Sequence, residues 1–530
     1  MGARTERLKR AVHVARVARR GKLFRVLREV GVVGERPATV EGAREFRGAL
    51  EELGTTYVKL GQLLSSRSDL LPDVYIEELS RLVDEVPPVP FADIERVLYE
   101  DLDRDLFATV DPEPLAAASI AQIHRAQLAN GLEVAVKVRR PQVEELVARD
   151  LDLIRSTARL LDKHSEAAQL LQVEALADEL DVHLRAELDL EEEAHNTELI
   201  AGLVGTSPHL VVPGVIRPYV TKRVLVLELL HGEKVSANHG LPPERASELA
   251  RELFRFYVRQ VTIEGVYHAD PHRGNVLLTP DGRLALLDFG LLGRLDEDTR
   301  RSLALLLLAV AQNRAEDVAD LILTLSLTTL GSDEPGFLHD IRRKLPRYHW
   351  RPLKDIRAGE ALADLQRLSL RYGIRLPPSF ALVGKTLSQA DSVARVLDPA
   401  LDPVALLEED AMTVMLEEAE TRLEPRALLS YIYVQLDALS RLPRRAAQVV
   451  DRLESGTVKV GIVPTDLGQL ERLAQSTANR LGAALIVVGL LVASALMARV
   501  SHTVAFVGFT CSFVLGLYML WKIIRTPGEL

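Results

Sequence analysis

The sequence predicts a two-lobed α+β protein in which a small β-containing part precedes a long helical part. Short apolar, β-like runs lie near residues 120–128, 133–138, 210–213 and 224–229, whereas helical periodicity is almost continuous after Asp288. Two long uncharged runs near the end of the chain predict a pair of membrane helices. With 530 residues, the chain exceeds the length of about 100–200 residues typical of one domain, so several parts are expected.

Composition excludes several classes of protein. The chain is 47% hydrophobic and 26% charged, which is unlike collagen, low-complexity disorder or a disulfide scaffold. It has one cysteine, which cannot form an internal disulfide and is typical of a reducing compartment. The net charge of −10 argues against a general nucleic-acid binder.

Charge is distributed unevenly along the chain. Residues 1–30 carry +8 and residues 471–530 carry +3, so the body between them holds −21. Residues 1–40 are predicted to form a basic amphipathic segment, because apolar side chains recur there at roughly helical spacing. This segment either lies on anionic lipid or remains a solvated helix or tail, and the pattern leaves both open.

Three further segments make up the body. Residues 41–90 are predicted to be a helical extension that ends at the proline-rich stretch 86–90. Residues 91–300 contain the strand-like runs and are expected to form the core. Residues 301–475 are predicted to be helical, and the apolar run Leu303–Ala311 is too short to span a bilayer, so we expect it to be a buried helix.

A transmembrane hairpin is predicted for residues 481–521. The runs Leu481–Ala498 and Thr503–Trp521 lack charged residues and are joined by only four residues. The alternative is a pair of buried soluble helices. Basic residues flank the side where the hairpin begins and ends, which predicts that the body lies in the cytoplasm; they are Arg472, Arg480, Lys522 and Arg525. The N-terminus lacks the apolar segment of a secretory signal.

The strongest chemical pattern is the stretch His268–Asn275 followed by Asp288–Gly290. In a kinase-type site an aspartate near the acceptor orients it or takes its proton, a role suited to Asp270. An asparagine five residues later and the aspartate of an Asp-Phe-Gly triplet hold Mg²⁺, which are roles suited to Asn275 and Asp288. Upstream, the strand-like Val134-Ala135-Val136-Lys137 ends in a lysine suited to nucleotide phosphates.

An alanine-rich segment stands where such a site normally has a glycine-rich loop. Ala116, Ala118 and Ala121 occupy the three glycine places and Ile123 the valine place. Each Cβ restricts positive φ and keeps the backbone farther from phosphates, so we expect the loop to handle nucleotide differently. The residues expected to contact the cofactor here are Leu115, Ala116, Ala117, Ala118, Ser119, Ile120, Ala121 and Ile123.

With these motifs, the sequence resembles the UbiB family of atypical protein-kinase-like proteins over roughly residues 45–400, continuing into the C-terminal hairpin of its bacterial members. The KxGQ motif of the family is Lys59-Leu60-Gly61-Gln62. Its AAAS loop is Ala116–Ser119, and its ExD motif is Glu187-Leu188-Asp189, with Glu193 and Asn196 following. The stretch RYGIRLPPSF, residues 371–380, is also similar to the family.

The resemblance implies a bilobal kinase-like fold whose helical KxGQ extension lies over a site for ATP or ADP with Mg²⁺. It implies catalytic roles for Lys59, Lys137 and Asp270, and metal binding by Asn275 and Asp288. Candidate partners for Lys59 or Lys137 are Glu187, Asp189 and Glu193, and the pairing is left open. The candidates for the adenine-contacting segment are Glu228 to Leu230.

The resemblance further implies ATP hydrolysis or self-phosphorylation that supports isoprenoid quinone biosynthesis, ubiquinone above all, at the bacterial inner membrane. Expected partners are membrane lipid, quinone precursors and quinone-biosynthesis proteins, and a homodimer is left open. Two alternatives are a nucleotide-binding scaffold without catalysis and a small-molecule phosphotransferase of the aminoglycoside-kinase type. The latter class lacks the KLGQ extension and the hairpin.

Three further patterns suggest sites that we reject. Gly384-Lys385-Thr386 resembles the end of a P-loop, but Ser379 stands where the first glycine belongs. His268 and His272 lack a third metal ligand, so His268 is expected to brace the catalytic loop. The alternating aspartates at 101, 103 and 105 lack the glycine and final glutamate of a calcium loop.

Overall fold

The computed structural model describes residues 2–20, 38–65, 67, 70–82, 86–164, 173–205, 207–236, 240–326, 332–349, 358–407, 507, 509–510 and 512–515. The chain divides into two units, Met1–Leu423 and Glu424–Leu530, and the first unit contains two lobes and a helical extension. Most of the predicted transmembrane hairpin lies outside the described residues. Among the residues that are described, no helix combines the length and the apolar character needed to cross a membrane.

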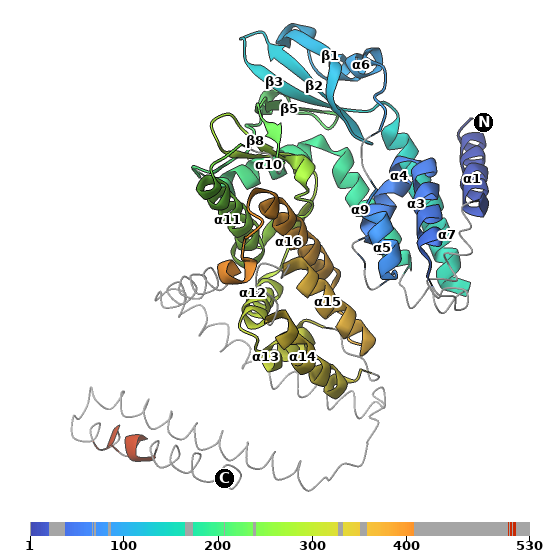
Figure 1. The fold of residues 1–530 in the computed structure, drawn as a ribbon. Coiled ribbons are helices and arrows are strands. Elements are labelled where there is room, and N and C mark those ends of the chain that lie inside the picture. Colours follow the sequence, from blue (N-terminus) through green and yellow to red (C-terminus); the bar gives the residue numbers. More distant parts are fainter. Residues whose placement is uncertain are drawn as a thin grey trace. The chain divides into compact units, whose positions relative to one another are not determined.

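A four-stranded antiparallel sheet forms the first lobe, which we call the sheet lobe (Figure 1). Its strands follow the order β1-β2-β3-β5, with β1 spanning Phe107–Ala117, β2 Ala121–Leu128, β3 Glu133–Arg139 and β5 Val224–Glu228. The sequence pattern does not reveal β1. This edge strand carries two prolines and two acidic residues in Asp111–Pro114, its register shifts there, and most of its side chains are exposed, so no apolar alternation marks it.

Alternation along β3 gives the sheet two different faces. Val134, Val136 and Val138 are fully buried against α6 (Phe91–Asp101), which contributes Ile94, Val97 and Leu98. Successive side chains of a strand point to opposite faces, so Ala135 and Lys137 lie on the other face. The valines therefore build the core of this lobe, while the lysine faces the remainder of the molecule.

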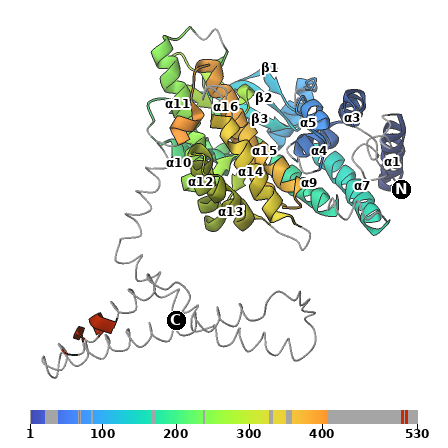
Figure 2. The same ribbon diagram turned by 60° about the horizontal axis from the view of Figure 1, so that its bottom comes forward.

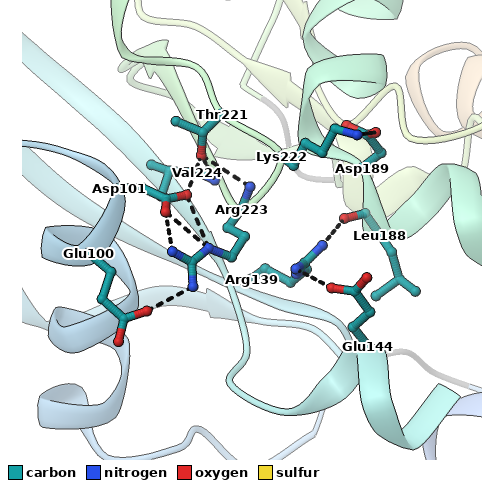
Figure 3. A network of polar contacts seen from close by, with 10 residues as sticks. All are labelled: Glu100, Asp101, Arg139, Glu144, Leu188, Asp189, Thr221, Lys222, Arg223 and Val224. Carbon is teal, nitrogen blue, oxygen red and sulfur yellow. Dashed lines mark hydrogen bonds and ion pairs between the residues drawn. The ribbon is translucent and has the colours of Figure 1, made fainter. Parts of the chain in front are cut away.

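Arginines join this sheet to the helices around it (Figure 3). Arg223, just before β5, binds Asp101 of α6 through Nε and Nη2 and Glu100 through Nη1. Arg139, at the end of β3, donates to the carbonyl oxygen of Leu188 at 2.7 Å. Leu188 ends α9 (Val173–Leu188), so the sheet fixes the position at which α9 gives way to α10 (Leu190–Val204).

The N-terminal extension packs as a separate small cluster of helices. It comprises α1 (Gly2–Arg20), α3 (Val40–Leu53), α4 (Thr55–Ser65) and α5 (Asp73–Leu79), with a core formed by Phe46, Leu50, Tyr57, Tyr75 and Leu79. Gly61 of α4 is buried where α4 approaches its neighbours most closely. Arg10 of α1 binds both carboxylate oxygens of fully buried Asp150 at 2.7 Å, which ties α1 to α7 (Val143–His164).

The second lobe, the helical lobe, holds the largest core. It begins with α11 (Pro243–Arg259), followed by the short strands β7 (Val266–His268), β8 (Val276–Leu278), β9 (Leu284–Leu286) and β10 (Leu292–Arg294). Five helices complete it: α12 (Glu297–Ala311), α13 (Ala315–Leu325), α14 (Glu334–His349), α15 (Ala358–Arg371) and α16 (Pro378–Leu397). The expected burial of Leu303–Ala311 is confirmed in α12, where Leu303, Leu306 and Ala309 are inaccessible to solvent. Figure 2 shows α15 beside α16, against which it packs.

Gly61 offers a test of the packing within the extension. A Cβ at this position would lie 2.3 Å from Leu82 Cδ1 and 2.7 Å from Leu50 Cδ1, so both leucines must move. We expect Gly61→Ala to lower the free energy of unfolding by about 1–2 kcal/mol because of overpacking. The measurement is the unfolding midpoint of the full-length protein in detergent.

The matched control is Gly48→Ala in α3, where no atom lies within 4 Å of the added Cβ. An alanine in a helix is more favourable than glycine, so this variant should gain about 0.5–1 kcal/mol. Equal behaviour of the two variants would contradict the close approach of α4 to its neighbours.

Candidate active site

A cavity of about 1440 Å³ lies where the sheet lobe, the helical lobe and the extension meet. Most of the residues expected at the site line it together: Lys59, Lys137, Glu187, Glu193, Glu228, Leu230, Asp270, Asn275 and Asp288. The alanine-rich segment also lines it, through Leu115, Ala116, Ala117, Ala118, Ile120, Ala121 and Ile123. Residues more than 200 positions apart in the sequence therefore share one chamber, as the two-lobed fold predicts.

Lys137 sits at the centre of a charged cluster. Its Nζ lies 2.6 Å from Glu193 Oε1 on α10 and 3.5 Å from Asp288 Oδ1. Burial opposes the charge on Lys137, but the two carboxylates outweigh it and raise the lysine pKa above its ordinary value. Attraction to Lys137 lowers the pKa of Asp288, so the aspartate is ionised at neutral pH. The site therefore presents a fixed cation with an ionised carboxylate beside it.

Lys59 of the extension forms the second lysine–carboxylate pair. Its Nζ lies 2.8 Å from Glu187 Oε2, and both side chains are largely shielded from solvent. The pairing left open by the sequence is thus resolved geometrically: Lys59 contacts Glu187, whereas Lys137 contacts Glu193. Because α4 and α9 carry the first pair, the extension is held against the wall of the cavity by a charge contact.

The role of Asp189 differs from the one that we expected, which was to pair with Lys59 or Lys137. Its carboxylate caps the N-terminus of α10 by accepting from the Glu191 N–H, and it lies 3.7 Å from Lys222 (Figure 3). It is not among the residues that line the cavity. A short acidic side chain at the start of a helix stabilises the free N–H groups there. The structure therefore makes Asp189 a capping residue instead of a partner of either lysine.

The alanine-rich segment forms the tight turn between β1 and β2. The Ala118 N–H donates to the Ala121 carbonyl at 2.9 Å, and no residue of this turn has a positive φ, so the alanines fit without backbone strain. Ile120 is buried in an apolar cluster with α7 and α9. The carbonyl of Ser119 accepts a hydrogen bond from Thr55 Oγ1 of α4, and the Ser119 side chain is buried away from the cavity. The turn is thus pinned to the extension.

The expected adenine-contacting segment lies at the end of β5. Glu228 and Leu230 both line the cavity, and Glu228 accepts from the Gly214 N–H at 3.3 Å. The Leu229 N–H donates to the Glu133 carbonyl at 3.3 Å. This segment connects the two lobes, and its position beside Ala135 of β3 is compatible with a planar base.

Asp270 follows β7, and its carboxylate is contacted by two residues of α16, which lies more than 100 residues later in the sequence. Lys385 Nζ lies 3.0 Å from Asp270 Oδ1, and Gln389 Nε2 donates to the same oxygen at 2.8 Å. Burial alone would raise the pKa of Asp270, but Lys385 and the hydrogen bond from Gln389 outweigh it and hold the pKa well below its usual range. Sequence reasoning misses both partners. The available signal is the tripeptide Gly384-Lys385-Thr386, which resembles a P-loop only in part.

His268 braces this loop. Its backbone N–H donates to Gln260 Oε1 at 2.9 Å, its carbonyl accepts from Thr386 Oγ1 at 3.3 Å, and its ring packs against Phe289 of the Asp-Phe-Gly triplet. Burial lowers the pKa of His268, so the ring is neutral at neutral pH. These contacts join the loop that carries Asp270 to the triplet.

Asn275 and Asp288 offer oxygens suited to Mg²⁺. The Leu287 N–H donates to the Asn275 carbonyl at 2.8 Å, which holds the two segments side by side. Asp288 has a φ of 58°, an unusual conformation for an aspartate that is found at functional sites. An amide, an ionised carboxylate, phosphate oxygens and water together form a donor set that Mg²⁺ accepts. Within the described residues, no cluster of three or more histidine, cysteine or acidic side chains competes for a metal.

The cavity continues beyond the nucleotide-type residues into an apolar region. Side chains of the extension, α9, α15 and α16 form its walls: Leu63, Ile76, Leu79, Leu180, Leu184, Leu362 and Phe380. Ligand sites for single small molecules usually occupy about 300–1,000 Å³, so the chamber is large enough for a nucleotide and a second, apolar molecule. Arg367 of α15 pairs with Asp73 of α5 at 3.1 Å across this region.

Removal of the central lysine tests the charged cluster. Glu193 is 5% exposed, so Lys137→Met leaves a buried carboxylate without its cation and should cost about 3 kcal/mol of unfolding free energy at pH 8. Burial raises the pKa of Glu193, and loss of the lysine raises it further, so protonation at pH 5 removes part of the penalty. Unfolding midpoints at the two pH values provide the measurement. Lys137→Met/Glu193→Gln should recover much of the loss, and a loss independent of pH would contradict this account.

Comparison with known proteins identifies three matching domains. Residues 81–322 match the ABC1 atypical kinase-like domain, residues 341–402 match the UbiB helical domain, and residues 465–525 match the ABC1/UbiB kinase-like C-terminal domain. A solved structure, the complex of Rv3197 with erythromycin from Mycobacterium tuberculosis, is 25% identical, covers 66% of this chain and 94% of that chain, and has a TM-score of 0.46.

Individual relatives extend over most of the chain. The probable protein kinase UbiB of Marinobacter nauticus is 36% identical over 374 residues, which is 67% of each chain. The probable protein kinase UbiB of Pseudomonas fluorescens is 31% identical over 427 residues, 79% of each chain. The chloroplastic protein ACTIVITY OF BC1 COMPLEX KINASE 3 of Arabidopsis thaliana is 32% identical over 67% of this chain and 51% of its own. The chain belongs to the UbiB family of atypical kinase-like proteins.

Proposed function

We propose that the protein is an atypical kinase-like ATPase that uses Mg-nucleotide to support isoprenoid quinone biosynthesis at a membrane. The observation that carries this proposal is the convergence of Lys137, Asp270, Asn275 and Asp288 in one cavity. Phosphoryl transfer requires a cation at the phosphates, a metal site and a carboxylate at the acceptor, and little covalent chemistry from the protein. These four side chains provide the required groups.

The chain's own residues then have distinct tasks. Lys137, held by Glu193, contacts the nucleotide phosphates, and the ionised Asp288 with Asn275 holds Mg²⁺, which neutralises charge on the phosphates when bound. Asp270 orients the attacking water or hydroxyl. The extension excludes bulk water and occupies the space in front of the site, which favours small or lipid acceptors over protein segments.

An apolar second ligand is the feature that links the site to quinone chemistry. The leucine-lined region continues directly from the nucleotide-type residues, which suits a prenylated phenol with its ring toward Asp270 and its tail among the leucines. The uncharged runs at 481–498 and 503–521 fall within the match to the family's C-terminal domain and suit a membrane anchor close to such lipids. The proposed partners are therefore membrane lipid, quinone precursors and quinone-biosynthesis proteins, with the body on the cytoplasmic side of the inner membrane.

A nucleotide-binding scaffold is the second candidate, and one observation favours it. Asp270 is already engaged by Lys385 and Gln389, as is expected of an aspartate that holds a conformation. A scaffold would bind Mg-nucleotide without turnover. Measurements of binding and hydrolysis on the same preparation separate the two functions.

Replacement of the metal-binding aspartate tests catalysis. We expect wild-type protein in lipid vesicles to hydrolyse ATP with Mg²⁺, and Asp288→Asn to reduce kcat by about 100-fold or more because a metal ligand is lost. Phosphate release is the measurement. The control is Asp281→Asn, an exposed aspartate of the β8–β9 turn, which should retain wild-type turnover. Retained turnover in Asp288→Asn would contradict the assignment.

The same variants test the pathway in the cell. Deletion of the gene should deplete isoprenoid quinone, which wild type and Asp281→Asn should restore and Asp288→Asn should not. Mass spectrometry of extracted lipids provides the measurement. Restoration by Asp288→Asn, with turnover abolished in vitro, would favour the scaffold.

The alanine turn generates a separate prediction about nucleotide preference. Ala118→Gly keeps the backbone hydrogen bond to Ala121 but removes the Cβ, which makes positive φ accessible and allows the backbone closer to phosphates. We expect the ratio of ATP to ADP affinity, or the extent of self-phosphorylation, to change several-fold. Calorimetry and radiolabel incorporation measure the two quantities. Ala129→Gly in the β2–β3 turn is the control, and unchanged behaviour of Ala118→Gly would show that the turn does not control nucleotide choice.

A further inference from the structure

The catalytic loop receives polar contacts from a helix outside the kinase-like domain. Lys385 and Gln389 lie on α16, more than 100 residues after Asp270, and both contact the same carboxylate oxygen. The match to the kinase-like domain ends at residue 322, and α16 falls in the segment matched by the helical domain. The site is therefore completed by a second domain.

One turn of α16 is arranged to hold the loop at two points. Lys385 and Gln389 are four residues apart and so lie on one face of the helix. Between them, Thr386 is fully buried and its hydroxyl donates to the His268 carbonyl. Contacts at both His268 and Asp270 fix the orientation of the intervening backbone as well as the carboxylate.

The helix itself is rigidly placed. Val383, Leu387 and Ala390 are fully buried in the largest core, which prevents α16 from shifting independently of the helical lobe. Lys385 nevertheless lines the cavity and retains 26% side-chain exposure. Lys385 therefore has a fixed backbone and a side chain that lines the cavity. This placement suits a residue that influences the reaction, and it differs from that of a lysine in an ordinary surface ion pair.

We propose that Lys385, assisted by Gln389, is a positioning residue that holds the Asp270 carboxylate aimed at the acceptor, so that the helical domain forms part of the active site. This inference rests on the proposed ATPase function and names a further residue needed for it. Because both donors bind the same oxygen, the other oxygen of Asp270 can orient a water or a hydroxyl. An aspartate stabilised in this way is a weak base, so its contribution is orientation and charge.

Several other titratable groups face this pair and must be considered in any pH profile. They are His268 and His272 of the catalytic loop, Asp288 beside His268, and Glu179 and His183 of α9. Burial lowers the pKa of His183, and Lys385 lowers it further. Loss of Lys385 therefore raises the pKa of both Asp270 and His183. Because burial also lowers the pKa of His183 and His268 below that of an ordinary histidine, the profile is measured in Lys385→Met/His183→Gln as well, where a moved acid limb reports Asp270 and not His183.

The experiment compares ATP hydrolysis by full-length Lys385→Met, Lys385→Arg and Gln389→Leu in lipid vesicles. We expect Lys385→Met to lower kcat about 10–100-fold while the Kd for Mg-ATP changes less than about threefold. Its acid limb of kcat should move to higher pH, because activity requires ionised Asp270 and the cation that favours ionisation is absent. Lys385→Arg should restore the low acid limb and part of kcat, and Gln389→Leu should show a smaller loss.

The control is Lys344→Met, which removes a lysine of α14 in the same helical lobe and should leave kcat and the pH profile unchanged. A Lys385→Met enzyme with wild-type kcat and an unmoved acid limb would overturn the inference. A loss of kcat with an unmoved acid limb would also overturn it, since it would indicate a merely structural lysine. Absence of turnover in wild type would instead overturn the proposed function itself, together with the inference that depends on it.

Discussion

The ion pair between Lys137 and Glu193 is the contact on which the arrangement of the site depends. It joins β3 to α10 across the cavity, and Asp288 of the helical lobe lies within reach of the same ammonium group. The side chains of Lys137 and Glu193 are nearly inaccessible to solvent, and either charge would be costly to bury without its partner, so the pair couples β3 to α10. The position of α10 is fixed in turn by the sheet, through Arg139 at the end of α9 and the cap at Asp189.

Much of this organisation is predictable because it depends on short, strongly patterned segments. β3 alternates valine with small or charged residues, and the spacing from Asp270 to Asn275 and Asp288 is typical of one chemistry. β1 is not predictable, since an exposed edge strand with two prolines has no apolar period. The sequence also does not predict which carboxylate pairs with Lys59 and which with Lys137. Glu187 lies on α9 and Glu193 on α10. The angle between these two helices depends on the contact that Arg139 makes with the Leu188 carbonyl at the end of α9.

Lys385 illustrates a different limit of sequence reasoning. In the sequence, Lys385 belongs to the tripeptide Gly384-Lys385-Thr386, which resembles only the end of a P-loop. A motif search considers neighbouring residues alone, so it gives no sign of a contact with Asp270. The contact with Asp270 spans more than 100 residues and depends on how α16 packs in the helical lobe. Groups contributed across domains in this way lack a local pattern, and only the three-dimensional structure reveals them.

The pinned alanine turn has a consequence for how nucleotide binding is driven. Ile120 packs against α7 and α9, and the Ser119 carbonyl accepts a hydrogen bond from Thr55 of the extension, so the turn should lose little conformational entropy when it meets phosphates. The ion pair between Lys59 and Glu187 likewise holds α4 against α9, so this wall of the cavity is also ordered by the protein's own contacts.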